Sequence, residues 1–272
     1  MLRDLLVHVD GTAAGRRRVS LAVDLANRAD ARLSGLHVTP SPEVPPRYKP
    51  SRVAEVAATI SGYLAADAQA AAAFGEETKK CRVETSWHEA AGDVVEGICK
   101  RARYADLVIL GQYECQGAAE AHPLPVAHSV VLHCGQPVLV VPADIGLSTF
   151  ARAAVAWDGS REAVRAAHDA VPLLHMSQSV EIVEMIGGPA EHDLDGERLS
   201  AHLSRHGIRT MPEILRISTA TEHESLREQL GHGHYDLIVM GAYSHSVWRE
   251  FIFGGATQSV LLSSRVPVLV SH

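Results

Sequence analysis

The second half of this 272-residue chain repeats the first half. The segment Val7–Thr12 (VHVDGT) returns as Val155–Ser160 (VAWDGS). Two more segments of the first half, Asp106–Gly111 and Pro137–Val140, return in the same order as Asp236–Gly241 and Pro267–Val270. An internal repeat on this scale constrains the chain to two halves of one fold, each of ordinary domain size.

Each half alternates short runs of Val, Leu and Ile with longer helical stretches. The predicted strands lie near 4–9, 32–38, 82–88, 106–110 and 137–141, then near 152–157, 179–186, 210–217, 236–240 and 267–271. The predicted helices lie near 14–29, 51–74, 92–103 and 124–134, then near 160–174, 190–206, 221–231 and 255–265. This alternation predicts an α/β fold with two tandem doubly wound domains, 1–144 and 150–272. Each domain would be a five-stranded parallel sheet with helices on both faces.

Composition excludes several classes of protein. The net charge of −7 argues against nucleic-acid binding, which needs a basic face. The four cysteines all lie in the first half and no pair has CxxC spacing, which favours reduced thiols and a cytoplasmic location. A strand begins almost at once, leaving no room for a signal peptide, and no apolar run approaches the roughly 20 residues that span a bilayer. We therefore expect no membrane partner.

A glycine-containing loop follows the fourth predicted strand of the second half. Gly241 permits a tight exit from the strand, and Gly254-Gly255 open the next helix. Ligands of doubly wound sheets bind beyond the carboxyl ends of the strands, and helix N-termini attract anions. Asp158 ends the first strand of this half at the same edge. The pattern predicts a phosphate-binding crevice in residues 150–272.

These residues carry a resemblance to the tandem-type universal stress proteins, which extends over the full chain. Nucleotide-binding members of that family have a G-x2-G-x9-G-S/T loop after the fourth strand and an acidic residue after the first. The resemblance implies a nucleotide site made of Asp158, Met185, Gly241, Ser244, Ser246, Gly254, Gly255 and Thr257. In it Asp158 meets the nucleoside, and the backbone near Met185 contacts the adenine.

Two loop positions depart from the family pattern. Ser244 stands where the second glycine is expected, which costs roughly 1–2 kcal/mol if that position needs a positive φ. Gly255 lacks the hydroxyl of the Ser/Thr position, and Thr257 or Ser246 is expected to supply it.

The first half keeps Gly111 but has lost the rest of the loop. Glu114 replaces the second glycine, Leu124-Pro125 replace the last two loop residues, and Glu120 adds a further negative charge. We expect no phosphate binding in this half. Asp10 remains, which leaves a neutral nucleoside or another small ligand open.

The resemblance implies a stress-response protein that binds ATP, with AMP and ADP as alternatives and Mg²⁺ accompanying the phosphates. Catalytic motifs such as GxxxxGK[ST] and GxSxG are absent, so we predict no catalytic residues and at most slow ATP hydrolysis. Two other functions stay open. One is a scaffold or interaction protein that binds no nucleotide, and the other is a small-molecule enzyme of the wider α/β nucleotide-binding superfamily.

Simpler structural interpretations apply to several of these residues. Asp158-Gly159-Ser160 is also the pattern of a helix cap, and Gly254-Gly255 is also a pattern for a plain turn. His202 and His206 have chelating spacing on a predicted helix, but no third ligand is evident, so no metal site is expected.

The last strands of the two halves are apolar edges, Val138–Val141 and Val268–Val270. Pairing between them would cover both edges and make the chain an intramolecular pseudo-dimer, with a homodimer as a further possibility.

Overall fold

A computed structural model describes residues 1–39, 53–112, 126–146, 148–186, 195–211, 213–218, 235–242, 260–261 and 264–272. The chain forms two compact units, Leu2–Cys134 and Gly135–His272, the second of which includes Met1. None of the described helices is long and apolar enough to cross a membrane.

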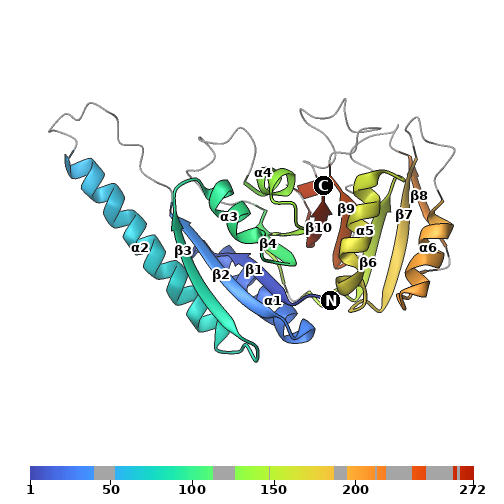
Figure 1. The fold of residues 1–272 in the computed structure, drawn as a ribbon, viewed down its shortest axis with the longest axis horizontal. Helices are drawn as coiled ribbons and strands as arrows, with labels where there is room; N and C mark the ends of the chain where they lie inside the picture. Colours follow the sequence, from blue (N-terminus) through green and yellow to red (C-terminus); the bar gives the residue numbers. More distant parts are fainter. Residues whose placement is uncertain are drawn as a thin grey trace. The chain divides into compact units, whose positions relative to one another are not determined.

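The first unit is a parallel sheet in the order β3-β2-β1-β4 (Figure 1). Its elements are β1 (Asp4–His8), α1 (Ala13–Ala29), β2 (Arg32–Thr39), α2 (Val53–Thr78), β3 (Thr85–Ala91), α3 (Val94–Ala102), β4 (Leu107–Gly111) and α4 (Val126–His133). β1 and β4 are continuous apolar runs that are almost wholly buried, as expected of strands covered on both faces.

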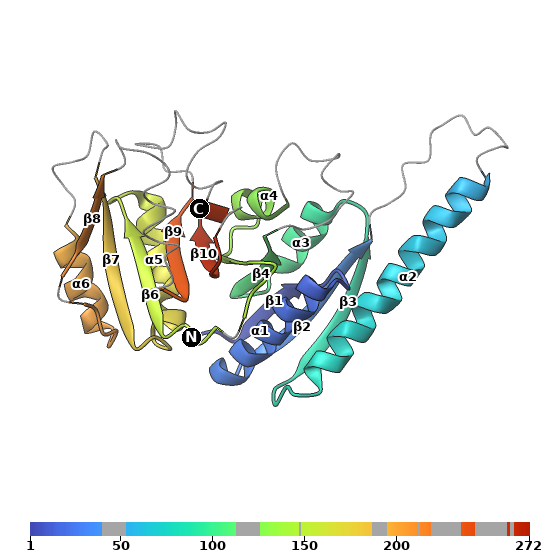
Figure 2. The same ribbon diagram turned by 180° about the vertical axis from the view of Figure 1, so that it is seen from behind.

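Helices cover both faces of this sheet (Figures 1 and 2). On one face, Gly35 of β2 lies so close to Phe74 of α2 that a β-carbon would come within 2.6 Å of the ring. On the other face, Val38 of β2 contacts Gly97 of α3. Gly35 and Val38 have opposite parity along the strand, so α2 and α3 lie on opposite faces.

The second unit has the strand order β5-β10-β9-β6-β7-β8. Its elements are β5 (Val138–Val141), β6 (Arg152–Trp157), α5 (Arg161–Leu174), β7 (Ser179–Ile186), α6 (Gly196–Arg205), β8 (Leu215–Ser218), β9 (Leu237–Gly241) and β10 (Val268–Ser271). The order β8-β7-β6-β9 matches β3-β2-β1-β4 strand for strand, and these pairings are parallel. The predicted α/β fold class is confirmed.

β5 and β10 are the one antiparallel pair among the described strands. Val268 lies opposite Val140, and Val270 lies opposite Val138. The expected pairing of these two apolar edges is confirmed, and all four valines are buried. β5 therefore groups with the second unit, although it ends the first repeat in sequence.

Two predicted strands were misplaced. The third strand was expected near 82–88 but spans Thr85–Ala91, because the backbone N–H of Arg82 donates to the side chain of Asn27 instead of to a neighbouring strand. The strand expected near 210–217 is the short β8, preceded by a single bridge between Val180 and Thr210. The helix predicted near 221–231 lies outside the described residues, as does most of the one near 255–265.

Candidate functional site

The first strand of each unit ends in the same tight turn. The Oδ1 atom of Asp10 accepts the N–H of Thr12 at 3.0 Å, and Oδ1 of Asp158 accepts the N–H of Ser160 at 2.9 Å. The intervening glycines, Gly11 and Gly159, both have positive φ, 73° and 71°. Only glycine adopts this conformation without strain, which explains the repeated Asp-Gly pair.

Both turns cap the following helix. Thr12 Oγ1 accepts the N–H of Gly15 at 2.9 Å, and Ser160 Oγ accepts the N–H of Ala163 at 3.1 Å. The capping interpretation of the Asp158 turn is therefore confirmed. Both turns lie at the carboxyl ends of their strands, the edge at which doubly wound sheets bind ligands. Capping the helix is therefore compatible with a contact between the same turn and a ligand.

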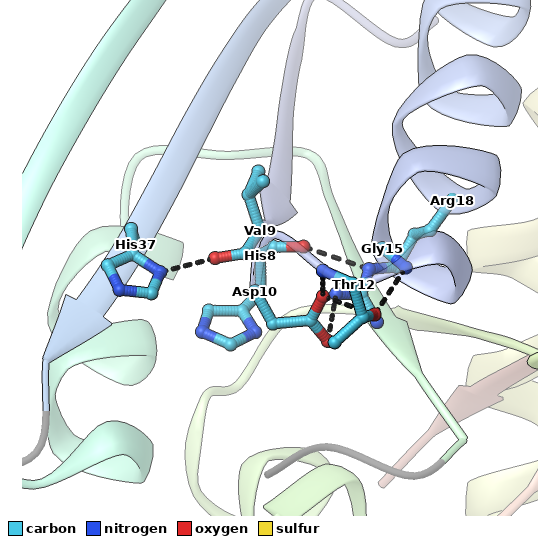
Figure 3. Close-up of polar contacts among 7 residues, drawn as sticks. All are labelled: His8, Val9, Asp10, Thr12, Gly15, Arg18 and His37. Atoms are coloured by element: carbon cyan, nitrogen blue, oxygen red, sulfur yellow. Dashed lines mark hydrogen bonds and ion pairs between the residues drawn. The ribbon is translucent and has the colours of Figure 1, made fainter. Parts of the chain in front are cut away.

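In the first unit, the acidic residue of the turn is held by a buried arginine (Figure 3). Arg18 of α1 is 2% exposed, and its Nη2 lies 3.2 Å from Oδ2 of Asp10 while its Nε donates to the carbonyl of His8 at 2.8 Å. Burial alone would raise the pKa of Asp10, but the charge of Arg18 and the hydrogen bonds from Thr12 outweigh it and lower that pKa. Asp10 therefore carries its negative charge at neutral pH, and its carboxylate is occupied by contacts with the turn and with Arg18 of α1.

Gly15 makes room for this arrangement. A β-carbon at Gly15 would lie 2.1 Å from Oδ1 of Asp10, far inside van der Waals contact. The carboxylate can therefore lie against the first turn of α1 only because that helix position is a glycine.

The second unit lacks the counterparts of both Gly15 and Arg18. By the repeat, Ala163 stands where Gly15 does and Ala166 stands where Arg18 does. Ala163 has a β-carbon where Gly15 has none, and Ala166, which is buried, offers no charge. The second unit therefore lacks the counterpart of the Asp10–Arg18 ion pair, although Asp158 makes the same hydrogen bond within its turn as Asp10 does.

The second strand of the first unit ends in another internal network. His37 Nδ1 lies 2.6 Å from the carbonyl oxygen of Val9 (Figure 3). Its Nε2 lies 2.9 Å from Asp67 of α2, which also accepts a hydrogen bond of 2.6 Å from Thr39. These contacts tie the ends of β1 and β2 to α2.

At the corresponding place in the second unit stands Glu184, the β7 residue opposite Trp157. Glu184 is almost fully buried, accepts the N–H of Gly196 at 2.7 Å and receives Arg216 Nε at 2.8 Å. These contacts tie the end of β7 to β8 and to the start of α6. The next residue, Met185, pairs through its backbone with Ile217, so this network anchors the strand segment predicted to contact adenine.

Gly241 has a packing reason to be glycine. A β-carbon there would lie 2.5 Å from the backbone of Glu162 and Ala163, so β9 passes directly against the first turn of α5. Gly241 and the Asp158 turn therefore lie at one edge, at the ends of adjacent strands β9 and β6. This is the switch point of the second unit, where doubly wound sheets bind ligands.

The remaining predicted ligand-binding residues, Ser244, Ser246, Gly254, Gly255 and Thr257, lie outside the described residues. So do the first-half positions Glu114, Glu120, Leu124 and Pro125.

Sequence reasoning missed the pairs Gly15/Ala163 and Arg18/Ala166. Extending the alignment of the two repeats a few residues past the Asp-Gly turn would have revealed both substitutions.

The histidine pair noted in the sequence has a third ring beside it. The ring of His202 lies 4.7 Å from that of His206 and 5.0 Å from that of His168 on α5, measured between centroids. Within the ranges that the structure describes, no three His, Cys, Asp or Glu side chains could hold a metal ion.

The chain belongs to the universal stress protein family, whose sequence model matches residues 1–142. The matched half is the one whose loop residues have diverged.

Over nearly the whole chain, the fold is similar to that of a universal stress protein from Archaeoglobus fulgidus, with a TM-score of 0.67, 19% identity, and 98% and 95% of the two chains covered. A second similar structure is a putative universal stress protein from Pseudomonas aeruginosa, with a TM-score of 0.57, 13% identity, and coverage of 99% and 93%.

A third structure is a universal stress protein in complex with cAMP, and the match covers 53% of the present chain and 98% of that protein at 19% identity. Its TM-score is only 0.33, so the cAMP in that structure carries no argument about the ligand of the present chain. No curated protein sequence matches the chain.

Proposed function

We propose that the second half of this universal stress protein binds one adenine nucleotide, with ATP as the expected ligand, and that the first half supports it. The observation that carries the proposal is the contrast between Asp10 and Asp158. Asp10 forms an ion pair with the buried Arg18, whereas Ala166 stands at the position of that arginine in the second half. A carboxylate at the switch point of a doubly wound sheet, where ligands bind, can accept hydrogen bonds from a nucleoside.

The backbone around Met185 supports the same assignment. Glu184 is buried and bound on two sides, which holds the end of β7 in one conformation. A preorganised strand end loses little entropy when its N–H and C=O groups bind a base. Gly241 brings β9 to the same edge, and the loop that begins there carries the glycines Gly254 and Gly255 expected to approach the phosphates.

The repeat also supports a second domain at 150–272. From the family resemblance, we further propose a role in stress tolerance, with the nucleotide acting as ligand or switch. A cytoplasmic location and a homodimer remain predictions from the sequence. In the first half, Arg18, His37 and Asp67 make contacts within their own domain, which suits a supporting role.

Calorimetry of the full chain with ATP and Mg²⁺ tests the proposal. We expect one site of micromolar affinity, about −8 kcal/mol. Gly254→Asp places a carboxylate where the phosphates approach and should weaken binding by at least about 2 kcal/mol, roughly 30-fold. Leu124→Asp, the same change at the aligned position of the first half, is the matched control and should leave the affinity unchanged.

Two results would contradict the proposal. If the chain binds no adenine nucleotide, the scaffold function is favoured. If Leu124→Asp abolishes binding while a folded Gly254→Asp binds normally, the site lies in the first half.

A further inference from the structure

The first unit contains a hollow of about 180 Å³ at the edge of the sheet opposite the Asp10 crevice. It lies at the amino ends of β1 and β2, below the carboxyl end of α3. Its polar lining comes from Asp4, Arg32, Ser34, Arg101 and Tyr104.

Two arginines converge on this hollow. Nε of Arg32 lies 3.1 Å from Glu84, and Nη2 of Arg101 contacts Nε2 of His88. The other guanidinium nitrogens of both arginines make no further hydrogen bond or ion pair within the described ranges. Each arginine thus keeps N–H donors that no hydrogen bond or ion pair within the described residues uses.

The positive charges of Arg32 and Arg101 both influence the side chain of His88. Arginine can only donate, so Nε2 of His88 accepts from Arg101 and the imidazole is neutral. Partial burial lowers the pKa of His88, and the charges of Arg101 and Arg32 lower it further. A chain of hydroxyls continues from this ring, since Ser86 Oγ lies 3.1 Å from Nε2 and 3.0 Å from Ser34 Oγ.

We propose that this hollow binds a small oxyanion of the phosphate class through Arg32 and Arg101. Planar guanidinium groups match tetrahedral oxyanions through paired N–H donors, which chloride cannot use. The Ser34 hydroxyl and the phenol of Tyr104, a residue that is 81% exposed, add donors at the rim.

Asp4 sets the limit on the charge of the ligand. The lining has one carboxylate and two guanidiniums, a sum of one positive charge, and Glu84, which pairs with Arg32 beside the hollow, offsets part of it. Its volume is roughly that of six water molecules, which fits a phosphate group with few further atoms. This site is independent of the nucleotide site proposed for the second half.

The test is an NMR titration of the full chain, labelled at histidine, with inorganic phosphate at constant ionic strength. Bound phosphate offsets both guanidinium charges, so the His88 resonances should shift saturably and the pKa of His88 should rise. Glycerol phosphate in a parallel titration distinguishes a phosphomonoester ligand from free phosphate by its tighter binding. Potassium chloride is the reference for non-specific screening.

Two variants make the test specific. Arg32→Gln, which does not touch His88, should weaken phosphate binding about tenfold or more, the loss expected of one charged hydrogen-bonding partner. Arg103→Gln is the matched control, because Arg103 lies directly after α3, two residues from Arg101, and does not line the hollow. The proposal is overturned if phosphate shifts His88 no more than chloride does, or if both variants bind phosphate as the wild type does.

Discussion

His128 is a buried histidine that we expect to make the protein sensitive to acid. It lies on α4, is 1% exposed, and neither ring nitrogen has a hydrogen-bond partner among the described residues. Burial lowers its pKa to about 4, from an ordinary value of 6.5. The folded state therefore holds the neutral ring, whereas the unfolded chain takes up a proton as the pH falls below 6.5.

The sign and size follow from linkage. Because the folded pKa is depressed, the stabilising contribution is complete above pH 6.5 and is lost as the pH falls towards 4. At 1.36 kcal/mol per pKa unit, the full loss is about 3 kcal/mol, of which about 2 kcal/mol is reached by roughly pH 5. His128→Leu removes both the titrating group and the two ring nitrogens that lack hydrogen-bond partners. The free energy of unfolding of this variant at neutral pH should therefore exceed that of the wild type by at least about 1 kcal/mol.

Urea unfolding at about pH 7.5 and pH 5, followed by far-UV circular dichroism, measures this difference. Other histidines titrate in both proteins and cancel when the two losses are subtracted. The wild type should lose about 2 kcal/mol more than His128→Leu on acidification. His133→Gln, a change on the same helix at a ring that contacts the Ser129 carbonyl, should behave like the wild type. Equal losses in wild type and His128→Leu would refute the reasoning.

Three more changes test the packing and the loop. Arg18→Met leaves the Asp10 carboxylate without its buried partner and should lower the free energy of unfolding in urea by about 3–5 kcal/mol. Adding Asp10→Asn to this variant should restore much of the lost stability. A loss below about 1 kcal/mol in Arg18→Met would contradict the ion-pair argument. Gly241→Ala should lower the free energy of unfolding by at least about 1–3 kcal/mol, because the new β-carbon meets the backbone of α5. Gly75→Ala is the control, because the space around Gly75 is open, and it should leave the stability unchanged or raise it. Equal effects of the two changes would show that β9 does not approach α5 closely. Ser244→Gly should tighten ATP binding several-fold in calorimetry by removing about 1 kcal/mol of backbone strain, and weaker binding would instead make the serine hydroxyl a ligand.

Local patterns in the sequence determined most of the architecture. The apolar runs placed β1, β4 and β9, because a strand buried on both faces favours a continuous run of Val, Leu and Ile. The repeated Asp-Gly pair determined the two turns, because a positive φ at that position requires glycine. The edge pairing of β5 with β10 followed from two apolar strands that each needed a partner.

The tertiary structure decided what the two acidic residues do. Asp10 and Asp158 each precede a glycine and make the same hydrogen bond within their turns, but the following helix brings an arginine against Asp10 and an alanine at the corresponding position after Asp158. Whether Arg18 reaches Asp10 depends on how closely α1 approaches the end of β1, and Gly15 permits that approach. Contacts of this kind depend on distances between elements in space, which hydrophobic periodicity does not encode.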